Sequence, residues 1–94
     1  MTKVVFRTFG QLTKFSKDNQ LDIDFNGETV QDFLRELQNR MGDGIKPILY
    51  PDGKNLSPMI FILINGKNIQ QLDGLKTKLN DGDIVSVLPV TAGG

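Results

Sequence analysis

The stretch at residues 29–42, TVQDFLRELQNRMG, decides the fold of this sequence. Its apolar residues recur at steps of three and four, with polar and charged residues between them; they are Val30, Phe33, Leu34, Leu37 and Met41. This spacing predicts an amphipathic helix. Thr29 is the expected N-cap, Asp32 closes an imperfect capping box and Gly42 follows the last turn. Because a lone helix of this length is marginal in water, the flanking segments must cover its apolar side.

Two segments before this helix are predicted strands. Residues 3–9, KVVFRTF, are rich in β-branched and aromatic side chains. In residues 21–26, LDIDFN, every second residue is apolar. That period is typical of a strand with one buried face. We expect the two strands to form a hairpin around the polar stretch at 14–20.

The segment after the helix is a predicted connection. Residues 42–58, GDGIKPILYPDGKNLSP, contain three glycines and three prolines. This composition indicates a long loop with a small turn at 51–53. Loops of this length are uncommon and often functional or mobile, so the order of this segment stays open.

Three further strands complete the expected sheet. Residues 59–64, MIFILI, are continuously apolar and suit a central strand. An Asn-Gly pair at 65–66 predicts a two-residue hairpin turn into a short strand at 67–70. An Asp-Gly pair precedes the last predicted strand, at 84–90. The order of elements predicts an α+β fold, with one main helix packed across a mixed sheet of four to five strands.

Size and composition exclude several classes of function. The chain has 94 residues, so we expect a single domain over 1–94. Eleven basic and eleven acidic residues cancel, so no overall charge favours nucleic acid or an anionic membrane. We find no apolar run long enough to cross a bilayer and no secretory signal, and we expect a cytoplasmic protein.

The side chains that most often carry enzyme chemistry are missing. The chain has neither cysteine nor histidine, which removes thiolate nucleophiles, imidazole bases and metal sites built on either. Asp81 and Asp83 flank a glycine, but the rest of a calcium motif is absent, so they are predicted to form a turn. Asp22 and Asp24 share one strand face and are expected to be solvated. We therefore predict no catalytic residue and no metal site.

The last two residues, Gly93 and Gly94, are the strongest functional signal. Without a Cβ, two glycines can enter a narrow channel at any backbone angle. We expect residues 90–94 to form a flexible tail that extends at most about 17 Å, enough to carry a carboxylate into another protein's active site. A frayed terminus is the simpler alternative.

The segment at residues 62–94 resembles the ubiquitin-like sulfur-carrier family of MoaD and ThiS, especially the longer archaeal MoaD-like proteins and small archaeal modifiers. The matching features are the strand running into Asn65-Gly66, the Gly74-Leu75 and Leu79 stretch, the Asp81-Gly82-Asp83 turn, Pro89 and the terminal Gly93-Gly94. The resemblance implies a ubiquitin-like β-grasp fold and a protein that is a co-substrate and not an enzyme.

The resemblance also implies how the C-terminus is used. A MoeB/ThiF-like activating enzyme would adenylate the carboxylate of Gly94 with ATP and Mg²⁺, and this chain would bind no cofactor of its own. Sulfur would then convert Gly94 to a thiocarboxylate that supplies molybdopterin synthesis or tRNA thiolation. In molybdopterin synthesis, this chain would be the small subunit of molybdopterin synthase and would act with the large subunit. Alternatively, a target lysine would form an isopeptide with Gly94, or the domain would bind partners without covalent chemistry.

We expect the partner to bind the face of the sheet opposite the helix. If Val4 and Phe6 face the helix, Val5 and Arg7 face away from it. Exposed apolar side chains near a reactive tail suit a docking surface. We define the docking face as five predicted residues, which are Arg7, Phe9, Phe61, Leu63 and Leu88.

Overall fold

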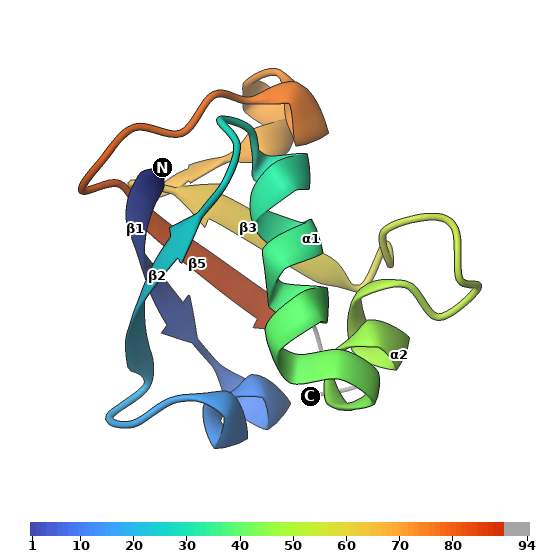
Figure 1. The fold of residues 1–94 in the computed structure, drawn as a ribbon. Helices are drawn as coiled ribbons and strands as arrows, with labels where there is room; N and C mark the ends of the chain where they lie inside the picture. Colours follow the sequence, from blue (N-terminus) through green and yellow to red (C-terminus); the bar gives the residue numbers. More distant parts are fainter. Residues whose placement is uncertain (90–94) are drawn as a thin grey trace.

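Five strands form one mixed sheet, and a helix crosses one of its faces (Figure 1). The computed structural model describes residues 1–89. The strands are β1 (Thr2–Thr8), β2 (Gln20–Phe25), β3 (Ile60–Ile64), β4 (Lys67–Asn68) and β5 (Ile84–Pro89), and the helix is α1 (Val30–Met41). The strand order is β2-β1-β5-β3-β4. The central pair, β1 and β5, is parallel, and the other pairs are antiparallel. The predicted α+β arrangement is confirmed.

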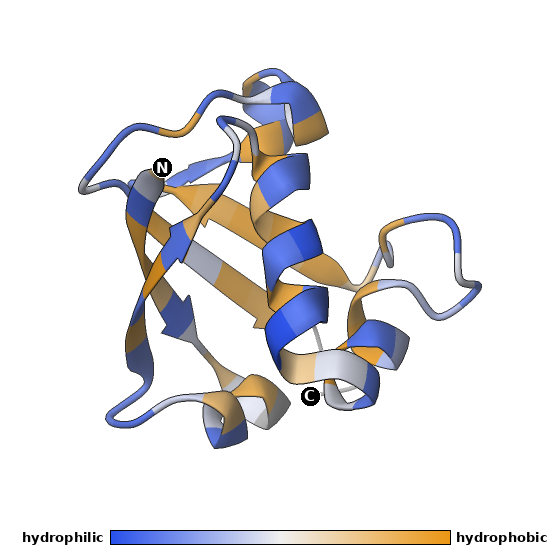
Figure 2. Cartoon of the chain, viewed as in Figure 1, coloured by the Kyte–Doolittle hydropathy of each residue, from blue (hydrophilic) through white to orange (hydrophobic). Residues whose placement is uncertain are grey.

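Alternation along the strands separates the two faces of the sheet. In β1, Val4 and Phe6 are fully buried, whereas Val5 is half-buried and Arg7 is exposed. The same period in β5 and β3 buries Val85, Val87, Ile60, Ile62 and Ile64. Figure 2 shows the hydrophilic side of α1 turned away from the sheet and hydrophobic residues where helix and strands meet. The expectation that Val4 and Phe6 face the helix is confirmed.

Helix α1 begins and ends as the sequence predicts. The backbone N–H of Asp32 donates to Thr29 Oγ1 at 3.2 Å. Asp32 Oδ2 accepts from the N–H groups of Glu28 and Thr29, at 3.0 and 3.2 Å, so the capping box is complete. These hydrogen bonds, first that from Glu28, lower the pKa of the Asp32 carboxyl. Gly42 ends the helix with φ at 56°.

Aromatic packing attaches α1 to the sheet. The ring of Phe33 meets those of Phe6 and Phe25 edge to face, each at a centroid distance of 5.7 Å. All three rings are buried. Phe33 therefore joins the helix to both strands of the first hairpin, and such aromatic pairs contribute beyond their buried area.

The link between β1 and β2 contains a short helix that the sequence pattern does not predict. A 3₁₀ helix, η1 (Gly10–Phe15), places Leu12 fully in the core. A tight turn follows, in which Asp18 and Asn19 have φ of 57° and 62°. The predicted antiparallel pairing of the two strands is correct, but the link is a packed segment and not simply a polar loop.

The prediction of one long connection at 42–58 is wrong in part. The segment contains a 3₁₀ turn, η2 (Gly42–Gly44), and a short helix, α2 (Lys46–Leu49). Ile45 and Leu49 lie one helical turn apart and are fully buried. Frequent glycine and proline are typical of a loop, so the composition of the segment does not indicate this helix. Proline nevertheless fits the first turn of a helix, because the N–H that it lacks would have no hydrogen-bond partner within the helix there.

The remaining boundaries differ by a few residues. Asn65 and Gly66 have φ of 51° and 89°, which confirms the predicted hairpin turn. The strand after it ends at Asn68, because the side chain of Asn68 accepts from the N–H of Gln70 and begins a 3₁₀ turn. Two such turns follow β4, η3 (Ile69–Gln71) and η4 (Gly74–Lys76). Within 1–89, no helix has the length and apolar character needed to cross a membrane.

Candidate functional site

Strand β5 ends at one edge of the ladder that it forms with β1 and β3, and its last residue, Pro89, is also the last described residue. Pro89 lies opposite Ile60 of β3, and β5 is held on its other side by β1. In Figure 1 this end of β5 lies toward η1, which it contacts. The expected tail at 90–94, with the predicted reactive residues Gly93 and Gly94, lies outside the described residues. The site that the structure does describe is therefore Pro89, which we call the root of the tail, and the surface around it.

Gly10 lies beside the root of the tail. Its φ of 57° is in the left-handed region that favours glycine. A Cβ added to Gly10 would lie 3.3 Å from Cγ of Pro89, a close contact. Because Pro89 is the last residue of β5, a side chain at Gly10 would press on the end of this strand.

The register of the sheet places four predicted docking residues side by side. Phe61 of β3 lies opposite Leu88 of β5. Leu63 and Arg7 both lie opposite Ser86, from either side of β5. Side chains directly opposite one another on one face are about 5 Å apart at Cβ. These residues therefore form two neighbouring rows on the face turned away from α1.

Phe9 completes the docking face. It extends β1 with φ of −141° and ψ of 153°, and Thr8 before it is buried, so Phe9 lies on the same side as Arg7. Phe9 and Phe61 keep 40% and 43% of their surface exposed. These are large values for aromatic side chains and leave both available to a partner.

Two residues near the docking face were missed. Ser86 lies between Arg7 and Leu63 and makes the centre of the face polar. Met59 precedes β3 and is 42% exposed. Period-two counting would have found Ser86 in the last strand, but residues 59–64 are apolar throughout, so no change of polarity marks the outer side of that segment.

The described residues supply little chemistry of their own. Arg7 is the single ionisable residue of the docking face. Among residues 1–89, no group of three Asp, Glu, His or Cys side chains could hold a metal ion. Burial raises the pKa of Tyr50, and hydrogen bonds from the N–H groups of Asn55 and Lys54 lower the pKa of Asp52, but both residues lie in the connection after α1.

The aspartates before β5 form a turn, as predicted. Asp81 Oδ1 accepts from the N–H of Lys3 at 2.9 Å, and Asp83 Oδ2 accepts from the N–H of Asn80 at 2.8 Å. Asp83 Oδ1 also accepts from the side chain of Asn65. These carboxylates tie the turn to β1 and to the hairpin, which fixes β5 in its central position.

A protein-family model described as ThiS family matches residues 6–94. This chain belongs to the ThiS family. The match includes both the sheet and the terminal glycines, so the resemblance of residues 62–94 holds for nearly the whole chain.

Relatives of this ThiS-family chain are sulfur carriers and modifiers by name. A candidate sulfur carrier protein of Archaeoglobus fulgidus is 40% identical over 78 residues, which cover 81% of this chain and 88% of the relative. Small archaeal modifier protein 3 of Haloferax volcanii is 46% identical over 66 residues, 70% of each chain. The solution structure of small archaeal modifier protein 1 from Methanosarcina acetivorans superposes with a TM-score of 0.83 at 33% identity, covering 100% of this chain and 98% of that one.

These similarities confirm the predicted ubiquitin-like β-grasp fold. They also confirm the predicted family of small sulfur carriers and protein modifiers, whose members are not enzymes themselves.

Proposed function

We propose that this chain is a sulfur carrier whose reactive group is the carboxylate of Gly94. The observation that carries the proposal is that the ThiS-family match extends through residue 94 and so includes both terminal glycines. The lack of cysteine and histidine fits this role, because an activating enzyme would supply the catalytic groups.

The proposed chemistry has two steps. In a MoeB/ThiF-like activating enzyme, an oxygen of the Gly94 carboxylate attacks the α-phosphorus of Mg²⁺-bound ATP, and pyrophosphate leaves. The acyl adenylate is a good electrophile because AMP is a good leaving group. A hydrosulfide-type nucleophile then attacks the carbonyl carbon, the bond to AMP breaks, and Gly94 carries a thiocarboxylate. Its sulfur would pass to a molybdopterin precursor, in the large subunit of molybdopterin synthase, or to tRNA.

The docking face would hold the activating enzyme while the tail enters its active site. Phe61 and Phe9 offer exposed aromatic surface, and Arg7 lies in the neighbouring row. Aromatic residues and arginine are enriched at the centres of protein interfaces. Leu88 of the docking face directly precedes Pro89 in β5, so one partner can contact both the face and the tail.

Protein modification is the second candidate function. It is favoured by the similarity to two small archaeal modifier proteins, one of them at 33% identity over the whole chain. In this role a lysine amine of a target displaces AMP from the same acyl adenylate and forms an isopeptide bond with Gly94. The two functions differ only in the nucleophile that arrives.

Intact mass spectrometry tests the first step and its outcome. The full chain is incubated with each MoeB/ThiF-like enzyme of its source organism, MgATP and sodium hydrosulfide. We expect the mass to rise by the difference between sulfur and oxygen, and the change to map to Gly94. A chain without Gly93 and Gly94 is the control and must stay unchanged. No mass change with any of these enzymes would contradict the carrier function.

Proteomics separates carrier from modifier. Tryptic digests of native cells are searched for lysines that carry residues 79–94, because Lys78 is the last trypsin site before Gly94. Finding such lysines would support modification. Their absence under good expression would contradict modification, and the carrier function would remain. If deletion of Gly93 and Gly94 preserves the cellular role, both functions are wrong and a non-covalent binding domain remains.

A further inference from the structure

The chain contains two Asn-Gly pairs, and the fold places their asparagines in different surroundings. They are Asn26-Gly27, between β2 and α1, and Asn65-Gly66, between β3 and β4. In such a pair the backbone nitrogen of the glycine can attack the side-chain amide, because glycine has no side chain that obstructs the approach. Asparagine is thermolabile for this reason. The rate then depends on how freely the asparagine side chain can turn toward that nitrogen.

The side chain of Asn65 is held against the start of β5 by both of its polar atoms. Its Nδ2 donates to Oδ1 of Asp83 at 3.0 Å, and its Oδ1 accepts from the N–H of Ile84 at 2.9 Å. The N–H of Asn65 also donates to the carbonyl of Ile84 at 2.8 Å. Attack by the nitrogen of Gly66 would require the side chain to turn and to break both of its hydrogen bonds. The packing of the hairpin turn on β5 therefore protects this asparagine.

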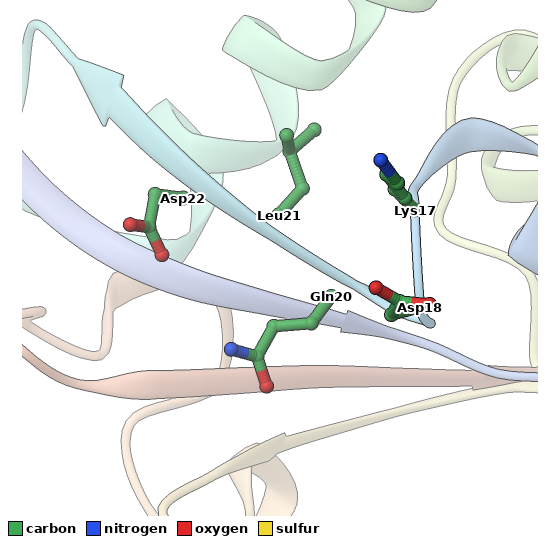
Figure 3. A pocket seen from close by; sticks show the side chains of 5 residues that line it. All are labelled: Lys17, Asp18, Gln20, Leu21 and Asp22. Carbon is green, nitrogen blue, oxygen red and sulfur yellow. The ribbon is translucent and has the colours of Figure 1, made fainter.

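The side chain of Asn26 has no such restraint. Figure 3 shows the alternation of β2, with Leu21 on one side of the strand and Gln20 and Asp22 on the other. The same period continues past the end of the strand and leaves Asn26 exposed. Within the described part of the chain, its side chain makes no hydrogen bond, and neither does the N–H of Gly27. Both reacting groups are therefore free to meet.

We propose that Asn26 deamidates spontaneously in the folded protein, whereas Asn65 is preserved. The nitrogen of Gly27 loses its proton and attacks Cγ of Asn26. A bond forms between this nitrogen and Cγ, the bond from Cγ to Nδ2 breaks, and the departing group takes up a proton and leaves as ammonia. Water then opens the resulting succinimide at either carbonyl and gives aspartate or isoaspartate. The modification goes beyond the proposed carrier function, because it uses neither Gly94 nor the docking face.

Isoaspartate would lengthen the backbone at a crowded point. The carbonyl of Gly27 accepts from Oγ1 of Thr2 at 2.7 Å, and a Cβ added to Gly27 would lie only 2.5 Å from Cβ of Asp32. One extra carbon before Gly27 must therefore disturb the bond to Thr2 or the capping box of α1. We expect the isoaspartate product to unfold at lower urea concentration than the Asn26→Asp chain, which has the new charge and an ordinary backbone. Equal stability would overturn this part of the proposal.

The site lies far along the sheet from the root of the tail. Asn26 follows Phe25, which pairs with Thr2 at the start of β1. Because β1 and β5 are parallel, Pro89 lies toward the other end of these strands. Asn26→Asp should therefore form thiocarboxylate at the wild-type rate, and failure of this proposal is distinguishable from failure of the carrier function.

Mass spectrometry of the stored protein tests the proposal. The full chain is kept folded in mildly alkaline buffer, and samples are digested briefly with trypsin, which places the two pairs in separate peptides, 18–35 and 55–67. We expect the mass increase that accompanies replacement of the amide by a carboxyl group at Asn26, at least about tenfold faster than at Asn65. Equal rates, a faster rate at Asn65 or no reaction at Asn26 would each overturn the proposal.

The chain unfolded in guanidinium chloride is the control for the fold. Both pairs then lack their tertiary hydrogen bonds, so they should deamidate at similar rates. If Asn65 stays as slow in the unfolded chain as in the folded one, its protection comes from the local sequence and the proposal is wrong. This comparison needs no variant.

Two variants test the assignment of the sites. Asn26→Gln should abolish the mass increase in peptide 18–35, because attack on the longer side chain must form a larger ring. A persisting increase would place the reaction at Asn19 and overturn the proposal. Asp83→Ala removes one hydrogen bond of Asn65 and should speed its deamidation by roughly threefold. An unchanged rate at Asn65 in a folded Asp83→Ala chain would contradict protection by these hydrogen bonds.

Discussion

At the scale of single residues, Gly10 connects backbone conformation to the position of Pro89, after which the predicted tail begins. An L-residue in the left-handed region costs about 1–2 kcal/mol, so Gly10→Ala should lower the free energy of unfolding by that amount. Its Cβ should also displace Pro89. We therefore expect slower adenylation by the activating enzyme, measured as kcat/KM, in addition to lower stability in urea.

Gly74 provides the matched control for Gly10. Its φ of 60° is nearly the same, but a Cβ there would have nothing within 4 Å. Gly74→Ala should lose similar stability and keep the wild-type kcat/KM. If both variants slow adenylation equally, Gly10 acts through stability alone and the contact with Pro89 does not matter.

Asp32 makes the stability of the chain depend on pH. Because the folded state lowers the pKa of Asp32 below its ordinary value of 3.8, its stabilising effect is complete above that value and is lost as the pH falls below it. We expect Asp32→Asn to be less stable than wild type at neutral pH, with the difference narrowing in acid. Urea unfolding across the pH range measures this.

Asp43→Asn is the control for Asp32. The side chain of Asp43 is exposed and makes no hydrogen bond or salt bridge in 1–89. Its replacement should change the free energy of unfolding little at neutral pH. An Asp32→Asn chain as stable as wild type at neutral pH would show that the capping carboxylate does not stabilise α1.

At the scale of elements, the turn that contains Ile45 and Leu49 tests whether the connection after α1 belongs to the core. Both side chains are fully buried. Ile45→Ala should therefore cost about 2–5 kcal/mol of unfolding free energy, measured in urea. Lys46→Ala, at an exposed position of the same turn, should cost almost nothing. A near-neutral Ile45→Ala would mean that the segment is loosely packed.

The elements also show why the sequence predicts some parts well and others poorly. α1 was predicted to the residue, because its apolar period, its cap at Thr29 and its glycine agree with one another. The turn around Ile45 was not, because two apolar residues are too few to establish a period. Leu12 in η1 was missed for the same reason. Burial of such single residues depends on tertiary contacts that no local pattern records.

The docking face was only partly accessible from the sequence. Alternation in β1 placed Arg7 outward, and the structure agrees. The rows that join Phe61 to Leu88 depend on the pairing register, which strand periodicity alone does not fix. Gly93 and Gly94 were identified from the sequence, and their role stays a prediction.

At the scale of the whole molecule, a substitution in the docking face should affect adenylation much more than the free energy of unfolding. Phe61 is 43% exposed, so Phe61→Ala should lower the free energy of unfolding by no more than about 1–2 kcal/mol. If this side chain anchors the activating enzyme, kcat/KM for adenylation should fall at least about tenfold. Adenylation kinetics with a cognate enzyme provide the measurement.

Leu72 is the control for Phe61. It is 39% exposed but follows η3, outside the strands that form the docking face. Leu72→Ala should leave kcat/KM unchanged. Equal losses in both variants would indicate a general effect of surface hydrophobicity, and no loss in Phe61→Ala would place the enzyme elsewhere.

The parallel pairing of β1 with β5 has a mechanical consequence. The start of β1 and the end of β5 lie at opposite ends of the same ladder, where Val5 pairs with Ile84 and Thr8 with Val87. Tension applied between these two points loads the ladder in shear, so its hydrogen bonds must break together and not one after another. A force that pulls the end of β5 while the start of β1 is held would therefore meet its greatest resistance at the first step.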